Sequence, residues 1–383
     1  MLDCLTVKPL SPSPGTLKSN VVLATVMKND INSILDRAIE GTRLDQDEIQ
    51  ALFDDGGLLE LGQVADAVRR RKNPDDVASY IIDRNINYTN VCVYRCRFCA
   101  FYRSVKDSEA YVLPFEEIAT KVSETVARGG TGILLQGGVH PELRIAYYES
   151  LLADLKNSFP QIHLHAFSVP EIWYLAKLEK MPVREVLERL VTAGLDSIPG
   201  GGAEILEDDT RRQIWSRAKA STDQWLGVHR EAHEFGLRTT ATMMFGVGEP
   251  ISARIVHLLG VRDLQDQSGG FTAFIPWTFQ DLGTDLENEV EPSGGYDYLR
   301  TLAISRLALD NVDHVQGSWV TQGPKIGQVS LFFGADDLGS IMLEENVVAA
   351  AGAQYRMSQS DMERVIREAG YSPRQRRTLY EPL

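Results

Sequence analysis

The strongest constraint on the fold is a regular alternation of short, apolar, strand-like runs with longer stretches of helical periodicity. Strands are expected at residues 80–89, 131–135, 161–166, 195–198, 237–245, 271–276, 312–316 and 329–333. Helices are expected between them at residues 114–128, 144–158, 170–193, 221–235, 251–266 and 295–310. Strands that alternate with helices form βαβ units and a parallel sheet. About eight such units favour an α/β fold of the TIM type, a (β/α)8 barrel, over an open sheet.

Segments outside this alternation suggest a division of the chain into four parts. Residues 1–28 contain helix-breaking Ser-Pro pairs and read as a flexible leader, and residues 29–75 carry three helical stretches. The barrel core is expected at residues 76–340. Residues 341–383, with helices near 341–351 and 358–369, are expected to pack on the barrel as a C-terminal helical segment.

Composition narrows the classes of protein that this chain can belong to. The chain has 383 residues, 43% of them hydrophobic, and a net charge of −14, which argues against broad binding to nucleic acid or anionic membranes. It has no apolar run of about 18 residues, so no transmembrane helix is expected. A signal peptide is not expected either, because Met1–Met27 lacks a basic region followed by a long apolar region. With only four cysteines and no disulfide framework, a reducing, cytoplasmic location is expected.

Three of the four cysteines lie within eight residues, directly after the first expected strand. Cys92, Cys96 and Cys99 have C-x3-C-x2-C spacing, and thiolates are soft ligands that suit iron–sulfur clusters and zinc. The strand ends of an α/β barrel are where its active site lies. A four-iron cluster with three thiolates keeps one iron open for a further ligand, which is how a metal centre performs chemistry.

Other interpretations of the cysteines are open at this point. Three ordinary buried cysteines would need no metal, but such close spacing is unusual for them. A zinc-stabilised binding protein would need a fourth ligand, and none is evident nearby. An electron-carrier domain would require Cys4 as the fourth ligand, 88 residues before Cys92 and in the expected leader.

The loop from Cys92 to Cys99 resembles the cluster-binding loop of the radical S-adenosylmethionine (SAM) superfamily. The resemblance implies that Cys92, Cys96 and Cys99 hold a 4Fe–4S cluster and that Phe98 lies beside the adenine of SAM. It also implies that Gln136, Gly137 and Gly138 form the motif that holds the methionine end of SAM, although many relatives have an acidic residue at the position of Gln136. Glycines at a strand end also suit an ordinary turn.

A second glycine-rich segment, at residues 197–206, follows the expected strand at 195–198. By the same resemblance, Ser197 and Glu204 are expected to contact SAM, with the Glu204 carboxylate accepting hydrogen bonds from the ribose or the amino group. A structural alternative exists, because an acidic residue that opens a helix is stabilised by the helix dipole.

Segments at residues 80–90, 317–328 and 332–346 resemble, more narrowly, the dehypoxanthine futalosine cyclases of the futalosine route to menaquinone. In that family a 5′-deoxyadenosyl radical removes hydrogen from C4′ of the substrate ribose. The carbon radical then closes a ring on the benzoate, and loss of an electron and a proton restores aromaticity. Aminofutalosine synthases and the synthases of the deazaflavin chromophore are similar relatives, and they remain alternatives.

This reaction requires a proton acceptor and polar partners for the small-molecule substrate, dehypoxanthine futalosine. His165 and Glu171, at the end of a strand and the start of a helix, are the candidate proton acceptors. Polar or aromatic side chains at strand ends and in the terminal motif are candidate substrate contacts: Tyr88, Asn90, Ser168, Trp277, Gln280, Lys325 and Asn346. Capping of helices and turns is the structural alternative for the polar ones, and a surface position is the alternative for Lys325.

Basic residues surround the cysteine loop of this acidic chain: Arg95, Arg97, Arg103 and Lys106. A local basic patch suits an acidic electron donor, so a reduced ferredoxin or flavodoxin is the expected partner. Ordinary surface charge, or contact with the carboxylate of SAM, explains these residues equally well.

Overall fold

The computed structural model describes residues 31–215 and 219–383. The expected leader over residues 1–28, with Cys4, lies outside the described residues. Within them, a seven-stranded parallel sheet forms the main wall of the molecule, in the order β2-β3-β4-β5-β6-β7-β8. Its strands are β2 (Asn85–Ile86), β3 (Gly132–Leu135), β4 (His163–Ala166), β5 (Ser197–Ile198), β6 (Arg238–Phe245), β7 (Phe271–Thr278) and β8 (His314–Val315).

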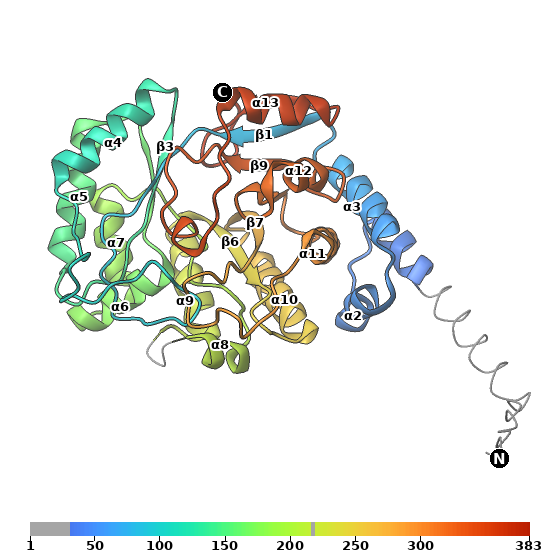
Figure 1. Cartoon of the computed structure of the whole chain (residues 1–383), viewed down its shortest axis with the longest axis horizontal. Coiled ribbons are helices and arrows are strands. Elements are labelled where there is room, and N and C mark those ends of the chain that lie inside the picture. The colour runs from blue at the N-terminus through green and yellow to red at the C-terminus, as the bar shows by residue number, and fades with distance from the viewer. Residues whose placement is uncertain (1–30, 216–218) are drawn as a thin grey trace, which may run out of the picture.

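A smaller parallel sheet completes the wall, in the order β10-β1-β9. Its strands are β1 (Val77–Ile81), β9 (Asp337–Ser340) and β10 (Ser372–Gln375). The chain runs from β1 directly into β2, and a single parallel bridge between Gln316 and Asp337 links the end of β8 to β9. The two sheets together surround one interior, which confirms the expected α/β barrel-type fold (Figure 1).

Helices cover the outside of this wall and connect its strands. They are α4 (Phe115–Ala127), α5 (Ile145–Ser158), α6 (Val169–Glu179), α7 (Val183–Ala193), α8 (Asp208–Ile214), α9 (Thr222–Glu234), α10 (Ile251–Ser268), α11 (Gly295–Ala308), α12 (Trp319–Ser330) and α13 (Gln359–Glu368). The alternation of periods in the sequence predicted eight of these helices, with α6 and α7 as one stretch. Helices α8 and α12 were not expected.

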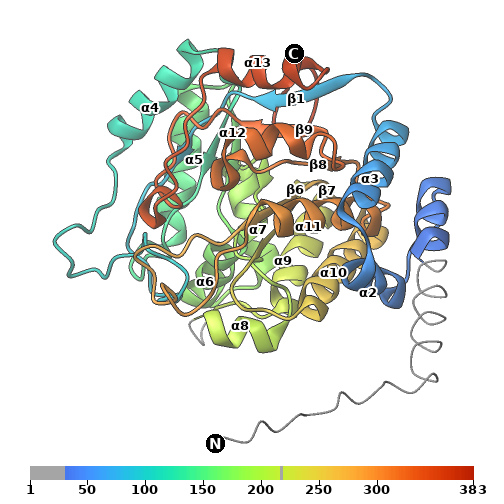
Figure 2. The ribbon, with the colours of Figure 1, turned by 45° about the vertical axis from the view of Figure 1, so that its right-hand side comes forward.

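The front of the described chain is helical, as the sequence predicted. A helix over residues 31–40 is followed by α2 (Gln46–Asp55) and α3 (Leu58–Lys72). Asp45 and Glu48 form a capping box that starts α2, because each side chain accepts a hydrogen bond from the backbone N–H of the other. Helix α3 packs on α11, and α2 packs on α10, so these helices lie against one side of the barrel (Figure 2).

Three details of the C-terminal part differ from the prediction. The apolar run at residues 329–333 spans the end of α12 and the following turn, and the strand forms later, as β9. The helix expected near 341–351 is wrong, because this stretch is irregular except for the 3-10 turn Ala349–Ala351. Strand β10, which pairs with β1 along four residues, was not expected at all. A short polar strand at the edge of a sheet has no clear hydrophobic periodicity in the sequence.

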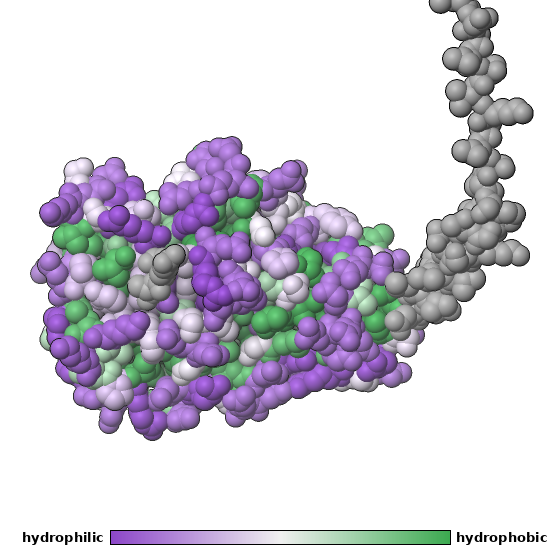
Figure 3. Space-filling view, turned by 90° about the horizontal axis from the view of Figure 1, so that it is seen from below, coloured by the Kyte–Doolittle hydropathy of each residue, from purple (hydrophilic) through white to green (hydrophobic). Residues whose placement is uncertain are grey.

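The surface of the protein carries both hydrophilic and hydrophobic residues. Figure 3 shows a face that is mostly hydrophilic, with small, scattered hydrophobic patches. Among residues 31–215 and 219–383, no helix is both long enough and apolar enough to cross a membrane.

Candidate active site

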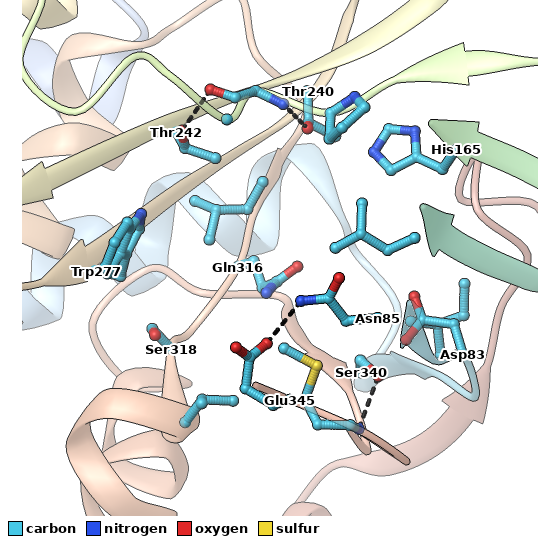
Figure 4. Close-up of a pocket in the computed structure, with 18 of the residues that line it drawn as sticks. Asp83, Asn85, His165, Thr240, Thr242, Trp277, Gln316, Ser318, Ser340 and Glu345 are labelled. Carbon is cyan, nitrogen blue, oxygen red and sulfur yellow. Dashed lines mark hydrogen bonds between the residues drawn. The ribbon is translucent and has the colours of Figure 1, made fainter. Parts of the chain in front are cut away.

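The barrel encloses a cavity of about 1400 Å³, measured out to its open mouth. Its apolar lining comes from several strands and includes Ile81, Leu134, Ile275, Trp277 and Leu338. Polar side chains from opposite parts of the wall also face it: Asp83, Asn85, Gln136, His165, Glu204, Thr240, Thr242, Gln316, Ser318, Ser340, Glu345 and Arg376. Figure 4 shows Asp83, Asn85 and Ser340 on one side of this cavity and Trp277 across from them.

The cysteine loop belongs to a separate small apolar cluster that includes Tyr94, Met244 and Phe279. Cys96 is buried, and Cys92 and Cys99 are partly buried. Burial raises the pKa of all three thiols, that of Cys96 to about 12, so a cation is needed to hold them as thiolates. Among the described residues, no three His, Cys, Asp or Glu side chains are arranged in advance around a metal. The donor set itself, three thiols on one loop, fits an iron–sulfur cluster with one open iron.

Lys219 connects the cysteine loop to the cavity. Its ammonium lies 3.0 Å from Glu204 Oε1 and 5.1 Å from the centre of the Phe98 ring. Glu204 lines the cavity, and its second carboxylate oxygen, Oε2, is buried without a hydrogen-bond partner. A buried carboxylate oxygen without a donor is a ready acceptor for a ligand hydroxyl or ammonium. Phe98 and Glu204, both predicted to contact SAM, therefore lie close to the same lysine.

The backbone before Glu204 leaves no room for side chains. A Cβ on Gly200 would lie 2.7 Å from the carbonyl oxygen of Thr240, and one on Gly202 would lie 2.3 Å from the Pro170 ring. Gly202 also has a φ of +85°, and Glu204 itself has a φ of +40°. A non-glycine residue with positive φ is uncommon and costs free energy, and such strain concentrates at functional sites. This turn holds the Glu204 carboxylate at the cavity.

The residues of the motif at 136–138 have two different roles. Gln136 lines the cavity, directly after β3. Gly137 and Gly138 do not line it; a Cβ on Gly137 would lie 2.7 Å from the Tyr88 ring, and one on Gly138 would lie 2.3 Å from the Val91 carbonyl oxygen. These two glycines therefore allow β3 to pack closely against the start of the cysteine loop, and their contact with SAM stays a prediction.

His165 lies in the cavity wall, on β4. It pairs in register with Leu134 on β3 and with Ser197 on β5. Its Nδ1 and the Nε2 of His163 both lie 2.6 Å from the Ser197 hydroxyl, so Ser197 is buried against two imidazoles. Ser197 does not line the cavity, and its contact with SAM stays a prediction. Burial lowers the pKa of His165 to about 3, so the ring is neutral and only weakly basic near neutral pH.

Glu171 caps helix α6, which is the structural alternative that its sequence position allows. With Ser168 it forms the capping box that starts α6, and Oε2 accepts hydrogen bonds from the Ser168 N–H and hydroxyl. Its Oε1 accepts from the Tyr88 hydroxyl at 2.6 Å and from the Gly137 N–H at 3.2 Å. Burial raises the pKa of Glu171 to about 7. The carboxylate is fully engaged and, like Tyr88 and Ser168, does not line the cavity.

Of the remaining predicted substrate contacts, the structure brings only Trp277 to the cavity. Gln280 folds back on its own strand end, where its amide donates to the Phe279 carbonyl at 2.9 Å. Asn90 donates to the Glu109 carbonyl and accepts from the Tyr111 N–H, which holds the loop after the cysteines. Asn346 donates to Asn87 and Glu344, and Lys325 is exposed on α12. Their roles with substrate stay predictions that the cavity does not support.

Sequence reasoning missed several polar residues of the cavity wall. Asn85 Nδ2 donates to Glu345 Oε2 at 2.9 Å, while Glu345 Oε1 accepts from the Val347 and Val348 N–H groups. Asp83 lies at the bend between β1 and β2, and Gln316 follows β8. The available signal was their position at strand ends, which is where barrels place active-site side chains. The bend at Asp83 was hidden because the sequence predicts one continuous strand.

The barrel, the three-cysteine loop after its first strand and the adjoining cavity define the architecture of a radical SAM enzyme. Comparison with known proteins agrees: residues 86–259 match the radical SAM superfamily, and residues 268–383 match the CofH/MqnC C-terminal region. The chain belongs to the radical SAM superfamily, in the branch that carries this C-terminal region.

Individual relatives show which members of the superfamily this chain is similar to. The chain is 46% identical over 359 residues to the cyclic dehypoxanthine futalosine synthase of Streptomyces coelicolor, across 93% of this chain and 90% of the relative. It is 39% identical to the aminodeoxyfutalosine synthase of Thermus thermophilus, across 91% of this chain and 95% of the relative. The crystal structure of methylornithine synthase shares the fold, with a TM-score of 0.68 at 20% identity, over 89% of this chain and 97% of that one.

Family membership assigns the cofactors to this chain: a 4Fe–4S cluster and SAM. The residues present fit both groups. Cys92, Cys96 and Cys99 supply three thiolates, and Glu204 Oε2 supplies an unpartnered acceptor at the cavity. The cavity beside Glu204 is mostly apolar with a few polar side chains, which is the common form of a small-molecule site.

Proposed function

We propose that this chain is a cyclic dehypoxanthine futalosine synthase, which closes a ring in dehypoxanthine futalosine during menaquinone biosynthesis. The observation that carries this proposal is the 46% identity to a synthase of that name across nine-tenths of both chains. The site supports it, because a three-cysteine loop is connected through Lys219 and Glu204 to a mostly apolar cavity inside the barrel. The reaction needs such a cavity, since a carbon radical must be kept from water and other hydrogen donors.

When bound, the cluster and SAM supply the 5′-deoxyadenosyl radical that removes hydrogen from C4′ of the substrate. We place SAM between the cysteine loop and the cavity, on Glu204 and Gln136, because both face the cavity and Glu204 reaches the cysteine loop through Lys219. Phe98, whose ring lies 5.1 Å from the Lys219 ammonium, is then positioned to pack on the adenine. Hydrogen bonds from two sides fix the orientation of SAM relative to the substrate.

The substrate is placed deeper in the cavity, against residues that the strands hold rigidly. Ile275 and Trp277 on β7 and Leu134 on β3 provide apolar walls for the benzoate ring. Asn85 and Gln316 carry amide groups that can hydrogen-bond sugar hydroxyls or the benzoate carboxylate. An apolar cavity with a few convergent polar groups is the common form of a small-molecule site.

A labelled substrate tests the proposed reaction. The purified protein, reconstituted with iron and sulfide, is incubated anaerobically with dithionite, SAM and dehypoxanthine futalosine that carries deuterium at C4′. We expect deuterium in 5′-deoxyadenosine and a product two hydrogens lighter than unlabelled substrate. If deuterium stays in the substrate, or if no cyclic product forms, the proposal is wrong.

Aminodeoxyfutalosine synthase is the second candidate, because a relative of that name is 39% identical over most of the chain. That activity joins the adenosyl carbons to the product, so it releases no free 5′-deoxyadenosine. Incubation with SAM that is labelled with carbon-13 in the adenosyl group separates the two. Label in free 5′-deoxyadenosine supports the cyclase, and label in the product supports the synthase.

We also propose that the electron comes from a reduced flavodoxin or ferredoxin in the cytoplasm. Arg95 and Lys106, near the cysteine loop, are exposed, while Arg97 and Arg103 pair with Glu289 and Glu109. Exposed positive charge steers an acidic partner toward the cluster. A double variant, Arg95→Ala with Lys106→Ala, should slow turnover with flavodoxin but not with dithionite. Equal turnover of variant and wild type with flavodoxin would refute this docking site.

A further inference from the structure

Six ionisable side chains of the described residues line the cavity: Asp83, His165, Glu204, Glu345, Arg376 and Tyr380. The ring closure releases a proton inside this cavity, so one of these groups is the natural acceptor. A general base must be deprotonated near the working pH and must not be occupied by stronger donors. The hydrogen bonds of each group decide which of them qualifies.

Most of the six groups are already engaged. Glu345 accepts hydrogen bonds on both oxygens, one from Asn85 and the other from two backbone N–H groups. Glu204 pairs with Lys219 through Oε1, and its unpartnered Oε2 is the oxygen that we assign to SAM. The Nδ1 of His165 contacts Ser197, and the ring is too weakly basic to hold a proton near neutral pH.

The two groups contributed by the C-terminal tail are engaged as well. Arg376 forms two hydrogen bonds to Asp337, with Nε at 2.6 Å and a second nitrogen at 2.9 Å. The Tyr380 ring lies between the Arg376 guanidinium, 3.8 Å from its centre, and the His314 ring. Burial raises the pKa of Tyr380 far above its usual range, so its phenol is already protonated and takes up no further proton.

Asp83 differs from these groups. It lies at the bend between β1 and β2, where its half-buried side chain lines the cavity. The Ser340 hydroxyl is its neighbour, and Figure 4 shows both side chains on the same part of the wall. Burial raises the pKa of Asp83 to about 6, and the hydrogen bond with Ser340 opposes that rise. A carboxylate with this pKa is ionised at pH 7 and still takes up a proton readily.

We propose that Asp83 is the catalytic base that accepts the ring proton in the closing step, an inference that rests on the proposed cyclase function. After the C4′ radical has bonded to the benzoate ring, the C–H bond at the attacked carbon breaks. Its proton goes to an oxygen of Asp83, and the remaining electron goes to a one-electron acceptor, an oxidised iron–sulfur centre. The ring becomes aromatic again, and the carboxyl group later releases its proton to solvent.

Charged groups around Asp83 come from three other segments of the wall. Arg376, directly after β10, favours the carboxylate form, whereas Asp337 on β9 and Glu345 after β9 disfavour it. Asp337 is neutralised by its pairing with Arg376. The net result is a carboxylate in the cavity wall that changes protonation at a pH of about 6.

The variant Asp83→Asn tests the proposal, because it keeps the shape of the side chain and removes its basicity. We expect the cluster spectrum and the transfer of C4′ deuterium into 5′-deoxyadenosine to be retained. Formation of cyclic product should fall by about 10²–10⁴-fold, the usual contribution of a general base. The amount of product per 5′-deoxyadenosine should fall with it, and a ring-centred radical should accumulate in electron paramagnetic resonance spectra.

Two controls separate catalysis from structure. Asp75→Asn replaces an exposed carboxylate near the start of β1 and should leave the ratio of product to 5′-deoxyadenosine unchanged. In wild type, that ratio should fall as pH drops below about 6, because protonated Asp83 cannot accept a proton. Asp83→Asn should show no such decline.

The experiments distinguish failure of the Asp83 proposal from failure of the proposed cyclase function. If wild type forms no cyclic product, the cyclase proposal itself fails. If wild type cyclises but Asp83→Asn keeps a normal ratio, Asp83 is not the base. If the variant does not fold, a wild-type ratio that is constant from pH 5 to 8 still overturns the proposal.

Discussion

Lys219 and Glu204 form an ion pair of 3.0 Å in which both side chains are 8% exposed, with the second oxygen of Glu204 left unpartnered. Burial makes such a pair costly unless further hydrogen bonds satisfy its remaining atoms. The pair is therefore incomplete as the protein stands, and a donor from SAM would complete it. This relationship explains why an acidic residue with positive φ is maintained at the edge of the cavity.

The first prediction is that Glu204→Gln and Gln136→Ala each weaken SAM binding without loss of the cluster. Removal of one hydrogen bond to a charged group costs about 1.5–3 kcal/mol, which is roughly tenfold to a hundredfold in Kd. Equilibrium binding of SAM to the reconstituted protein measures this. Glu234→Gln, on an exposed part of α9, is the matched control. An unchanged Kd in both variants would mean that these residues are structural.

The second prediction concerns the cysteines. Replacement of Cys92, Cys96 or Cys99 by Ala should remove most of the bound iron and all substrate turnover, because a cluster held by two thiolates is not retained. Iron analysis and the visible absorption spectrum check the result. Cys4→Ser should leave both unchanged, which would also exclude the four-cysteine electron carrier. Full activity in any of the three Ala variants would refute the ligand assignment.

The third prediction is a dependence of stability on pH that comes from Glu171. Burial raises the folded-state pKa of this carboxyl to about 7, above its usual value of 4.5. The folded state then binds more protons than the unfolded state between these two values, so Glu171 makes the free energy of unfolding fall as pH rises through that window. Glu171→Gln has no such ionisation and should gain about 1–3 kcal/mol relative to wild type between pH 5 and 8.

Chemical unfolding of both proteins at several pH values measures this difference. The result also separates two roles of Glu171, because its hydrogen bonds to Ser168, Tyr88 and Gly137 are structural. Glu171→Gln should keep cyclisation within a few-fold of wild type. A loss of cyclisation with normal formation of 5′-deoxyadenosine would instead restore Glu171 as the proton acceptor.

Much of the barrel could be predicted from sequence because helices and strands with one buried face carry distinct periods. Strand β6 illustrates this, since the predicted residues 237–245 differ from Arg238–Phe245 by one residue. The cysteine loop could be predicted because metal ligands must be close in space and here are close in sequence. The part of the barrel built by β9 and β10 could not, because these strands are short, polar and placed by tertiary contacts.

Tertiary contacts also limit how much of the cavity could be predicted from the sequence. Trp277 and His165 lie on regular strands, where successive side chains alternate between the two faces. The sequence pattern could therefore identify them as candidates for the cavity wall. Asp83 faces the cavity only because the chain bends between β1 and β2, and Glu345 only because an irregular segment folds over the barrel. Tyr88 and Ser168 were predicted to bind substrate, but a polar side chain near a strand end serves a helix cap equally well.

The last prediction concerns the buried pair that fixes the C-terminal strand to the barrel. Arg376 directly follows β10, and Asp337 lies on β9, on the other side of β1. Their side chains are 6% and 0% exposed, and they form two hydrogen bonds at 2.6 and 2.9 Å. Arg376→Met leaves the Asp337 charge buried, with only the Ser79 hydroxyl and the Gly339 N–H as donors. Loss of one partner of such a pair costs about 3–5 kcal/mol, so we expect that decrease in the free energy of unfolding.

A double variant tests the physical cause of this loss. Asp337→Asn, combined with Arg376→Met, removes the uncompensated charge but keeps an oxygen that accepts from Ser79, so it should recover most of the lost stability. Arg374→Met, two residues earlier on β10, is the matched control, because Arg374 is 45% exposed and lies 3.7 Å from an Asp75 carboxylate that is 71% exposed. That exposed pair should contribute less than about 1 kcal/mol. If Arg376→Met and Arg374→Met unfold at the same denaturant concentration, the pair does not anchor β10.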